Sequence, residues 1–568
     1  MKKEMSMEVR LLLAFGLMGL VLLVSQFFMK PVAPAQKPTA AVVVNNAQNS
    51  AQPVPAEAVK KPAPAAASLI APIKTIGGIH ADKEETVTVD TNVFHVTFSN
   101  KGAVARNWIL KNYKDHDNKP LEVIYQPGLA KVLAPFSVNF RERGPSANPN
   151  EALYKTTRSD DGLEVSFEFS DGHAYAKKTF HFEPASYLVA VTSEVRQDGA
   201  TLPHTLMWRG GFGDPSIQNP ASVQRAIYYD LPNNKLQAKV AKDAKDSAVG
   251  ASGQFSFAGI EDSYFAAAFL PGGKTAVDQT TYADTVPDKA GKDELRVGMG
   301  VGSGDINQLS MFVGPKDTDL LRKVDPKLEQ LVDWGFFGVI AKPLFEVLNW
   351  TADHISHNYG WAIVLVTLAI NLLLFPFKIS SMKSSKKMQT LQPQIKAIND
   401  KYKNLSMRDP KKAEQNQELM DFYKKHDVNV AGGCLPLVVQ LPFLWAFYKV
   451  LNVAIEMRGA HWAWIPDLSQ PETLALHLLP VLLVATQFLQ QRMTPSPGMD
   501  PNQQKMMMFM PLMMGYMFYF ASAGLVLYWL TGNVVAIAQQ WGLNKFLPSA
   551  PMQVISPPKN NGNQKKGK

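Results

Sequence analysis

The chain has 568 residues, of which 46% are hydrophobic and 19% charged, and its net charge is +9. Its mean hydropathy of -0.10 excludes a protein that lies wholly within a membrane, because long apolar runs are averaged here against a large water-soluble part. Cys434 is the only cysteine, which excludes a fold that is held together by disulfide bonds.

The first apolar run, residues 11–29, follows three basic residues and is nineteen residues long. That length is enough to cross a membrane, and it exceeds the apolar core of a signal peptide, which spans about 7 to 15 residues. We therefore predict an uncleaved transmembrane anchor over residues 1–30. A cleaved signal peptide is the alternative, because small residues near Ala33 and Ala35 resemble a processing site.

Residues 31–78 are rich in Ala, Pro, Val, Asn and Gln, a composition that buries too little apolar surface to fold, so we expect an extended linker. Beyond it, apolar and polar residues alternate, for example over residues 94–98 and 165–169, which is typical of half-buried strands. Asp171 and Gly172 supply the positive φ of a tight hairpin turn. We predict one large β-sandwich over residues 79–325.

Residues 326–358 mix aromatic side chains such as Trp334, Phe336 and Trp350 with the charged Lys342 and Glu346. This mixture is typical of an amphipathic helix that lies on the outer surface of a membrane. A linker helix packed on the sandwich is the alternative.

Five more apolar runs follow, and with the anchor they make six predicted transmembrane helices. They cover residues 361–377, 431–453, 474–489, 506–520 and 525–537. The first, fourth and fifth of these runs are near or below the roughly 17 residues that a span needs. We expect such short helices to thin the bilayer around them, within a core domain over residues 359–545.

Lys and Arg are concentrated in the segments that we place in the cytoplasm. Residues 378–429 hold 12 basic and 6 acidic side chains, and the chain from Trp541 onward holds five Lys and no acid. Both termini, including a basic tail over residues 546–568, are therefore predicted to be cytoplasmic, and the sandwich lies on the other side. The positive charge then indicates attraction to anionic lipids and not recognition of nucleic acid.

The segment 378–429 is predicted to form a helical hairpin. Apolar residues recur at spacings of three and four, which draws one stripe along a helix: Met388, Leu391, Ile395, Ile398, Tyr402 and Leu405. Asp409 as N-cap and Pro410 at the first helical position indicate a second helix. Because Pro393 interrupts the stripe, Met388 and Leu391 belong either to the hairpin or to an extension of the preceding span. The hairpin is either a plain connector or a docking arm.

Polar side chains are few within the predicted spans. Thr367 and Asn371 are four residues apart and share a helix face, and Lys378 follows seven residues later. Gln440 stands between two prolines, so its helix either lines a hydrated space or packs inside a bundle. No span contains Asp or Glu and no matching halves are visible, which disfavours an ion-coupled transporter.

Seven methionines occur between Met506 and Met517. Their flexible, polarizable side chains suit a surface that packs against varied apolar helices. Met that faces lipid or fills gaps is the alternative.

Several segments together resemble the YidC-type membrane protein insertases of bacteria. The strongest is GGCLPLVVQLPF at residues 432–443. WAIVLVTLAINLLLFPF at 361–377, LQPQIKAI at 391–398, DPNQQKMMMFMP at 500–511 and SAGLVLYWLTGN at 522–533 are similar too, as is DSYFAAAFLP at 262–271. Because these segments occur in the right order along most of the chain, the resemblance is specific.

The resemblance implies an insertase and folding chaperone with a five-helix core, an N-terminal anchor, a periplasmic β-supersandwich and a cytoplasmic hairpin. It implies no catalytic residue, metal or cofactor. A client's polar segment would enter a hydrophilic groove that is closed on the outer side, while its apolar helix slides along the third and fifth spans. The implied groove residues are Thr367, Asn371, Gln440, Tyr528 and Trp529, and the implied sliding surface is Leu435, Val439, Phe443, Met510, Met513, Met514 and Met517.

One position departs from the family pattern. Members typically carry an arginine where this chain has Asn371, which keeps the polarity but loses the attraction for acidic client residues. Lys378 lies about 10 Å further along the helix at 1.5 Å per residue. It is the candidate for the missing groove charge, unless Pro376 disturbs the helix between them.

The implied partners are nascent membrane proteins, membrane lipids, the Sec translocon for larger clients, and the ribosome and signal recognition machinery through the hairpin and tail. The implied location is the inner membrane of a Gram-negative type of bacterium. The alternative function is that of a membrane-anchored periplasmic binding or scaffold protein.

Overall fold

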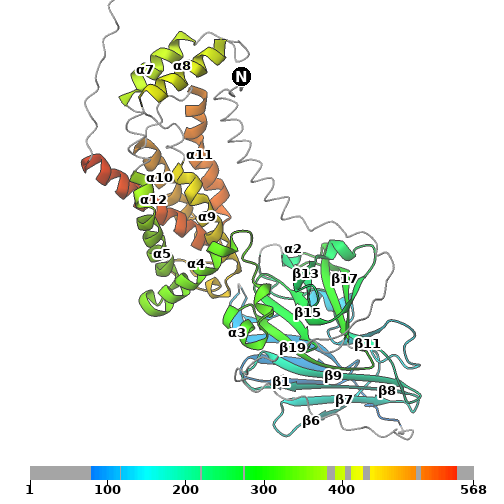
Figure 1. Ribbon diagram of the computed structural model, residues 1–568. Helices are drawn as coiled ribbons and strands as arrows, with labels where there is room; N and C mark the ends of the chain where they lie inside the picture. The colour runs from blue at the N-terminus through cyan, green and yellow to red at the C-terminus, as the bar shows by residue number, and fades with distance from the viewer. Residues whose placement is uncertain are drawn as a thin grey trace, which may run out of the picture. The chain divides into compact units, whose positions relative to one another are not determined.

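The computed structural model describes residues 78–546 except 116, 218–219, 273–275, 303, 380–389, 403–410, 427–434 and 494–500. The predicted anchor, most of the linker, Cys434 and nearly all of the predicted tail lie outside the described residues. The described chain divides into a β-rich unit, which runs to Lys316 and includes residues 321–330, and a helical unit of residues 317–320 and from 331 onward (Figure 1).

The β-rich unit contains three antiparallel sheets. The first has the order β13 (Lys235–Lys239), β12 (Arg225–Asp230), β15 (Phe255–Glu261), β16 (Phe265–Leu270), β19 (Ile306–Pro315), β9 (Leu188–Gln197), β8 (Ala174–Phe182), β7 (Glu164–Ser170) and β6 (Lys155–Arg158), and β10 (Ala200–Thr201) pairs with β9. The second is β1 (Thr86–Asp90), β2 (Phe94–Ser99), β3 (Val104–Lys114) and β4 (Pro120–Glu122). The third is β14 (Val249–Gly253), β17 (Val277–Pro287), β18 (Asp293–Gly302), β11 (His204–Trp208) and β5 (Ser137–Phe140).

Short helical segments accompany these strands. They are η1 (Gln126–Ala130), α2 (Pro220–Val223), η2 (Ala241–Ala244), α3 (Thr318–Val324) and η3 (Leu328–Leu331).

The predicted alternation is confirmed in β2 and in the first part of β7, where Val165 and Phe167 are buried; it is wrong at Phe169, which is half-buried while Ser170 is buried. Phe94, Val96 and Phe98 of β2 are fully buried, whereas the residues between them are half-buried. β7 and β8 form the predicted hairpin, and Gly172 in its turn has a φ of +96°. The period-two pattern therefore predicts the inward face of β2 and of the first part of β7.

The sheets pack face to face through aromatic side chains. Phe98 of β2 lies 4.6 Å from Phe180 of β8, measured between ring centroids, and Trp108 of β3 lies 6.0 Å from Trp208 of β11. These contacts join the three sheets around one core, so the predicted β-sandwich is confirmed as a β-rich layered domain.

Lys178 lies inside this core and is fully buried. Its Nζ donates hydrogen bonds to the carbonyl oxygens of Gly102 at 2.7 Å, Ala103 at 3.2 Å and Phe136 at 2.7 Å. Burial lowers the pKa of its ammonium to about 7. The side chain therefore fastens the chain beside β3 and the segment before β5 to the ten-stranded sheet.

The helical unit begins with α4 (Gly338–Thr351), which continues as a π-helical turn over Ala352–Ser356. It goes on with α5 (Tyr359–Leu373), α7 (Gln392–Lys401), α8 (Lys411–Lys425), α9 (Leu435–Val453), η6 (Ile455–Met457), α10 (Leu478–Met493), α11 (Pro501–Tyr519) and α12 (Ala523–Phe546) (Figure 1).

Taken one at a time, the helices of the described segments do not reach the length and apolarity that crossing a membrane requires. Gly338–Ser356 and Tyr359–Leu373 reach them as a pair, with a bend of 115° between the two. The number of transmembrane helices expected from the sequence therefore stays a prediction.

Several helix boundaries differ from the sequence-based ones: α5 ends at Leu373 and not at residue 377, and α11 begins at Pro501 and not at residue 506. α10 begins at Leu478 and not at residue 474, because His477 has a φ of +43° and Glu472 Oε2 accepts a hydrogen bond from the Leu479 amide at the helix start. α12 runs to Phe546, beyond the expected end near residue 537. Its last two turns are more polar, so hydropathy alone did not extend it.

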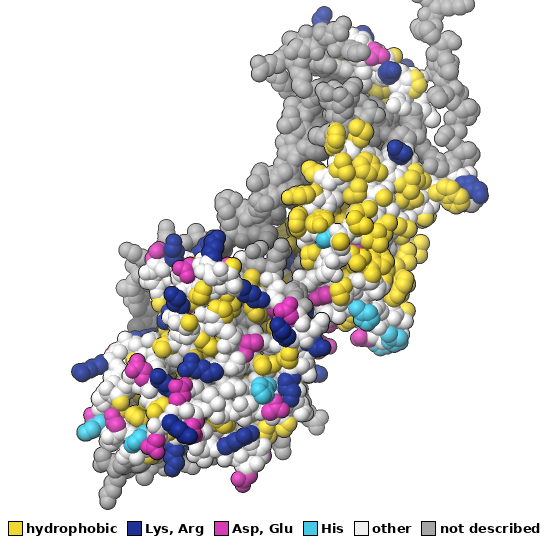
Figure 2. Space-filling model, turned by 180° about the vertical axis from the view of Figure 1, so that it is seen from behind, with side chains coloured by type: hydrophobic (Ala, Val, Ile, Leu, Met, Phe, Trp, Pro, Cys, Tyr) yellow, Lys and Arg dark blue, Asp and Glu magenta, His cyan; other side chains and the backbone are white. Residues whose placement is uncertain are grey.

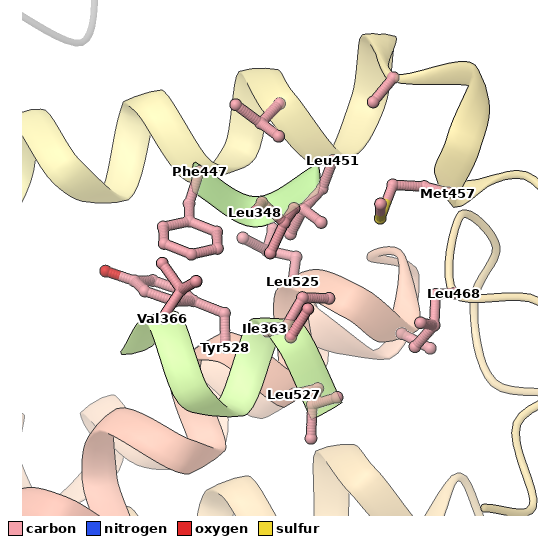
Figure 3. Packing of buried hydrophobic residues seen from close by; sticks show 14 of the residues in the cluster. Leu348, Ile363, Val366, Phe447, Leu451, Met457, Leu468, Leu525, Leu527 and Tyr528 are labelled. Atoms are coloured by element: carbon pink, nitrogen blue, oxygen red, sulfur yellow. The ribbon is translucent and has the colours of Figure 1, made fainter. Parts of the chain in front are cut away.

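A compact apolar core joins α4, α5, α9, α10 and α12 (Figure 3). Leu348 of α4, Ile363 of α5 and Leu451 of α9 are fully buried in it. The inner face of α4 thus packs on α5 and α9 of its own unit. Its other face leaves Val339 and Trp350 exposed, as expected of an amphipathic helix.

The outside of the helical unit is strongly apolar (Figure 2). Of the large apolar side chains that are exposed among the described residues, Leu133 and Ile306 lie in the β-rich unit, and all the others lie between Phe336 and Trp541. An exposed apolar surface of this extent is expected where lipid or another protein covers it.

α7 and α8 pair as the predicted hairpin. Ile395 of α7 is buried with Leu419 and Tyr423 of α8, and the Tyr402 hydroxyl donates to Glu418 Oε2 at 2.9 Å. Pro393 is the second residue of α7, in the first turn, where a proline does not interrupt a helix. Leu391 contacts the hairpin core, which places it with the hairpin. Met388, Leu405, Asp409 and Pro410 lie outside the described residues.

Candidate functional site

Thr367 and Asn371 lie on the buried face of α5, as their spacing predicted. Thr367 is fully buried and Asn371 is 6% exposed. The Thr367 hydroxyl donates to the Ile363 carbonyl at 2.6 Å, and Asn371 Nδ2 donates to the Thr367 carbonyl at 2.8 Å. Each of the two side chains therefore uses one donor within its own helix, which lowers the free-energy cost of its burial.

Asn371 also connects α5 to Lys378 and to α12. Its Oδ1 accepts a hydrogen bond from Lys378 Nζ at 2.7 Å. Lys378 Nζ contacts Gln539 Oε1 at 3.4 Å, and Gln539 Nε2 donates to the Asn371 carbonyl at 3.4 Å. A turn at Leu374 separates α5 from the helical residues 375–379, and Pro376 does not prevent the contact.

Gln440 and Tyr528 also meet inside the unit. A hydrogen bond joins their side chains across α9 and α12, and the Tyr528 ring stacks on Phe447 with centroids 4.1 Å apart (Figure 3). Trp529 lies on the next position of α12 and packs edge-on against Phe518 at 5.0 Å. The structure thus arranges the predicted groove residues in two sets, one around Asn371 and one around Gln440.

The predicted sliding surface divides into exposed and inward side chains. Met510, Met513 and Met517 of α11 are exposed, and Phe443 of α9 is half-buried. Met514 turns inward, packs against the apolar core and accepts a contact from Gln487 Nε2 at 3.7 Å. The side chains of Leu435 and Val439 are not among those that the structure describes.

Gln539 is the residue that the sequence analysis missed. It stands at the end of the last apolar run, where a polar residue is expected simply to mark the membrane boundary. Its spacing of six residues from Asn533 gave no sign of a contact with Asn371, because that contact depends on how α5 and α12 pack.

Charge is distributed asymmetrically at this site. The described stretches of α5, α9, α10, α11 and α12 contain no Asp or Glu. The partners of Lys378 among the described residues are amide oxygens. The described residues also contain no group of three or more His, Cys, Asp or Glu side chains that could hold a metal ion.

An apolar exterior that surrounds a few buried polar side chains is the arrangement of a membrane-embedded helical protein, here on the same chain as a β-rich domain with a polar surface. Comparison with known proteins agrees with that class. The family described as 60Kd inner membrane protein matches residues 350–550, and the YidC periplasmic domain matches residues 86–347.

Relatives match along most of the chain. The membrane protein insertase YidC of Ralstonia nicotianae is 33% identical over 506 residues, covering 86% of this chain and 88% of its own. The membrane protein insertase YidC of Syntrophus aciditrophicus is 30% identical over 562 residues, covering 95% of this chain and 100% of its own. This chain belongs to the YidC family of membrane protein insertases, inner-membrane proteins with a periplasmic domain.

Proposed function

We propose that the chain inserts newly made membrane proteins into the inner membrane and assists their folding. Family membership over most of the chain carries this proposal. We assign the passage of polar client segments to the inner faces of α5, α9 and α12, around Thr367, Asn371, Gln440, Tyr528 and Trp529. Polar groups within the membrane lower the free energy that is needed to remove water from a polar client segment, because they replace some of its hydrogen bonds.

Thr367 and Asn371 are covered by protein in the arrangement described above. A polar client segment therefore reaches them only when the packing between α5 and α12 opens toward the cytoplasmic side. Besides the shared apolar core, two contacts of the Gln539 amide at 3.4 Å join these helices near Asn371, and contacts of this length are weak. The client's apolar helix would meanwhile pack on the exposed Met510, Met513 and Met517.

The remaining assignments complete the proposal. We place the α7–α8 hairpin and both termini in the cytoplasm, where the ribosome and signal recognition machinery would dock, and the Sec translocon beside the core for larger clients. We also keep the division into an anchor (1–30), linker (31–78), periplasmic domain (79–325), interfacial helix (326–358), insertase core (359–545) and tail (546–568).

The function is tested by depleting the protein and counting which membrane proteins fail to insert. A chain that lacks residues 80–320 distinguishes the alternatives, because an insertase keeps most of its activity without the β-rich unit. A periplasmic binding or scaffold protein loses its function with the same deletion.

The route is tested by cysteine labelling after Cys434 is replaced. Single cysteines at Thr367, Asn371 and Gln440 should react with a hydrophilic thiol reagent when a stalled client is engaged. Leu365, on the exposed side of α5, supplies the matched lipid-facing control. If the three positions stay unreactive with and without a client, the proposed route is wrong.

A further inference from the structure

The Lys378 ammonium points back along its own helix. A lysine at the end of a transmembrane helix ordinarily extends toward the lipid headgroups, where its charge is hydrated. Here Nζ lies 2.7 Å from the side-chain oxygen of Asn371, seven residues nearer the middle of the helix. The half-buried side chain therefore carries its charge toward the interior of the unit.

Two amides hold the ammonium in that place. Asn371 Nδ2 is engaged by the Thr367 carbonyl, which leaves Oδ1 directed at Lys378. Gln539 Nε2 faces the Asn371 carbonyl, which leaves Oε1 directed at the same ammonium. Because amide nitrogens donate and amide oxygens accept, these contacts fix which end of each amide faces the charge.

Holding the Lys378 ammonium in this half-buried place costs more free energy than a purely structural contact would. Burying part of an ammonium without a carboxylate is unfavourable, and no carboxylate lies within ion-pair distance of Lys378 among the described residues. A neutral side chain would satisfy the two amides at lower cost. An ammonium has three N–H donors, so it keeps capacity for an anionic partner beside its two amide acceptors.

We propose that Asn371 and Gln539 position Lys378 as the cation that binds carboxylates in the hydrophilic segments of clients. This inference rests on the proposed function and names the client chemistry that its site favours. Asn371 and Gln539 act as positioning residues, since they orient the ammonium and carry no charge.

The test uses the full-length protein in proteoliposomes and one single-span client with three versions of its translocated tail, carrying two Asp, two Asn or two Lys. The readout is the ratio of acidic-tail to neutral-tail insertion, measured by protease protection at increasing salt. In the wild type this ratio should exceed one and fall with salt, because screening weakens a partly hydrated ion pair.

Lys378→Gln should lower the ratio about tenfold and remove its salt dependence, whereas Lys378→Arg should retain both. Gln539→Leu should lower the ratio severalfold and leave it salt-dependent, since the charge remains but is held less firmly. Asn371→Arg combined with Lys378→Gln should restore the ratio. Lys545→Gln, which removes an exposed basic residue at the end of α12, should leave it unchanged and controls for a general loss of positive charge.

The outcomes separate this inference from the proposed function. If the wild type inserts both clients and Lys378→Gln leaves the ratio and its salt dependence unchanged, the inference is wrong and the function stands. If the wild type inserts neither client better than protein-free liposomes do, the proposed function fails. Should Lys378→Gln not fold, Gln539→Leu decides the question: an acidic-tail to neutral-tail ratio equal to that of the wild type would overturn the inference.

Discussion

The β-rich and helical units place their polar and apolar side chains in opposite ways. The β-rich unit buries Trp108, Trp208 and Phe180 and exposes charged residues, as a domain in water does. The helical unit buries Thr367 and Asn371 and exposes a broad apolar surface (Figure 2). The β-rich unit thus has the side-chain distribution of a domain in water, and the helical unit has that of a domain in lipid.

The buried polar contacts of the two units differ as well. The β-rich unit buries ion pairs such as Arg225 with Glu261 at 2.6 Å and Lys316 with Glu261 at 3.3 Å. On the described stretches of α5, α10 and α12, the side-chain contacts between helices come from neutral groups, as between Asn533 and Thr486 at 3.3 Å, and the buried carboxylate of Glu472 lies in a connecting segment. Burying a neutral group in a low-dielectric interior costs less free energy than burying a charge. Lys378, a cation without a carboxylate partner among the described residues, therefore departs from this pattern.

The largest expected effect concerns the buried charge of the β-rich unit. Lys178→Met should destabilise this unit by about 4 kcal/mol, because three buried carbonyls lose their donor. Hydrogen exchange of β8 and β9 in the full-length protein measures the effect. Lys177→Met, on the less buried side of the same strand, is the matched control. Equal effects of the two substitutions would show that the carbonyl contacts are not important.

The apolar core of the helical unit should respond almost as strongly. Phe447→Ala removes a fully buried ring that stacks on Tyr528 and should cost about 3 kcal/mol. Met513→Ala, at a side chain that is 68% exposed, should change the thermal midpoint in detergent very little. A large loss in Met513→Ala would contradict the view that the outward apolar face serves contacts with lipid or clients and not the fold.

Acid should weaken the β-rich unit through His204. Burial lowers the pKa of its imidazole to about 4 from 6.5, and its Nδ1 donates to the Leu202 carbonyl while Nε2 accepts from Ser193. The unfolded chain binds this proton first, so the stabilisation is complete above pH 6.5 and falls by about 3 kcal/mol toward pH 4.

Urea unfolding of the β-rich unit between pH 7 and 4, in the full-length protein, measures this dependence. His204→Gln should flatten it. His173→Gln should not, because His173 is exposed and Asp198 raises the pKa of its ring. Parallel curves for the wild type and His204→Gln would exclude His204 as the cause.

The smallest expected effect lies at the start of α10. Glu472 accepts hydrogen bonds from the Trp464 indole at 2.7 Å and from the Leu479 amide at 2.7 Å. Glu472→Gln can keep one of these contacts and turns an amide donor toward the other, so we expect a loss of about 1 kcal/mol. Faster hydrogen exchange at Leu479 should report it, and the exposed Glu346→Gln should leave that amide unchanged.

Local patterns were sufficient for much of the fold. Alternation in β2 and the spacing of Ile395 and Tyr402 predicted which faces turn inward, and Gly172 predicted the hairpin turn. These features depend on residues close together in the chain, so periodicity and turn chemistry can identify them. The polar face of Thr367 and Asn371 was predicted for the same reason.

Such patterns could not predict the contacts between segments that are distant in the chain. The sequence by itself determined which residues face inward, where the chain is apolar enough to meet lipid, and which family it resembles. The tertiary structure alone decided that Lys178 reaches carbonyls beside β3 and β5, and that Gln539 of α12 faces Asn371 of α5. The reason is physical: periodicity defines a face, but many faces are equally apolar, and their partners are selected by side-chain shape and polar complementarity once the elements pack.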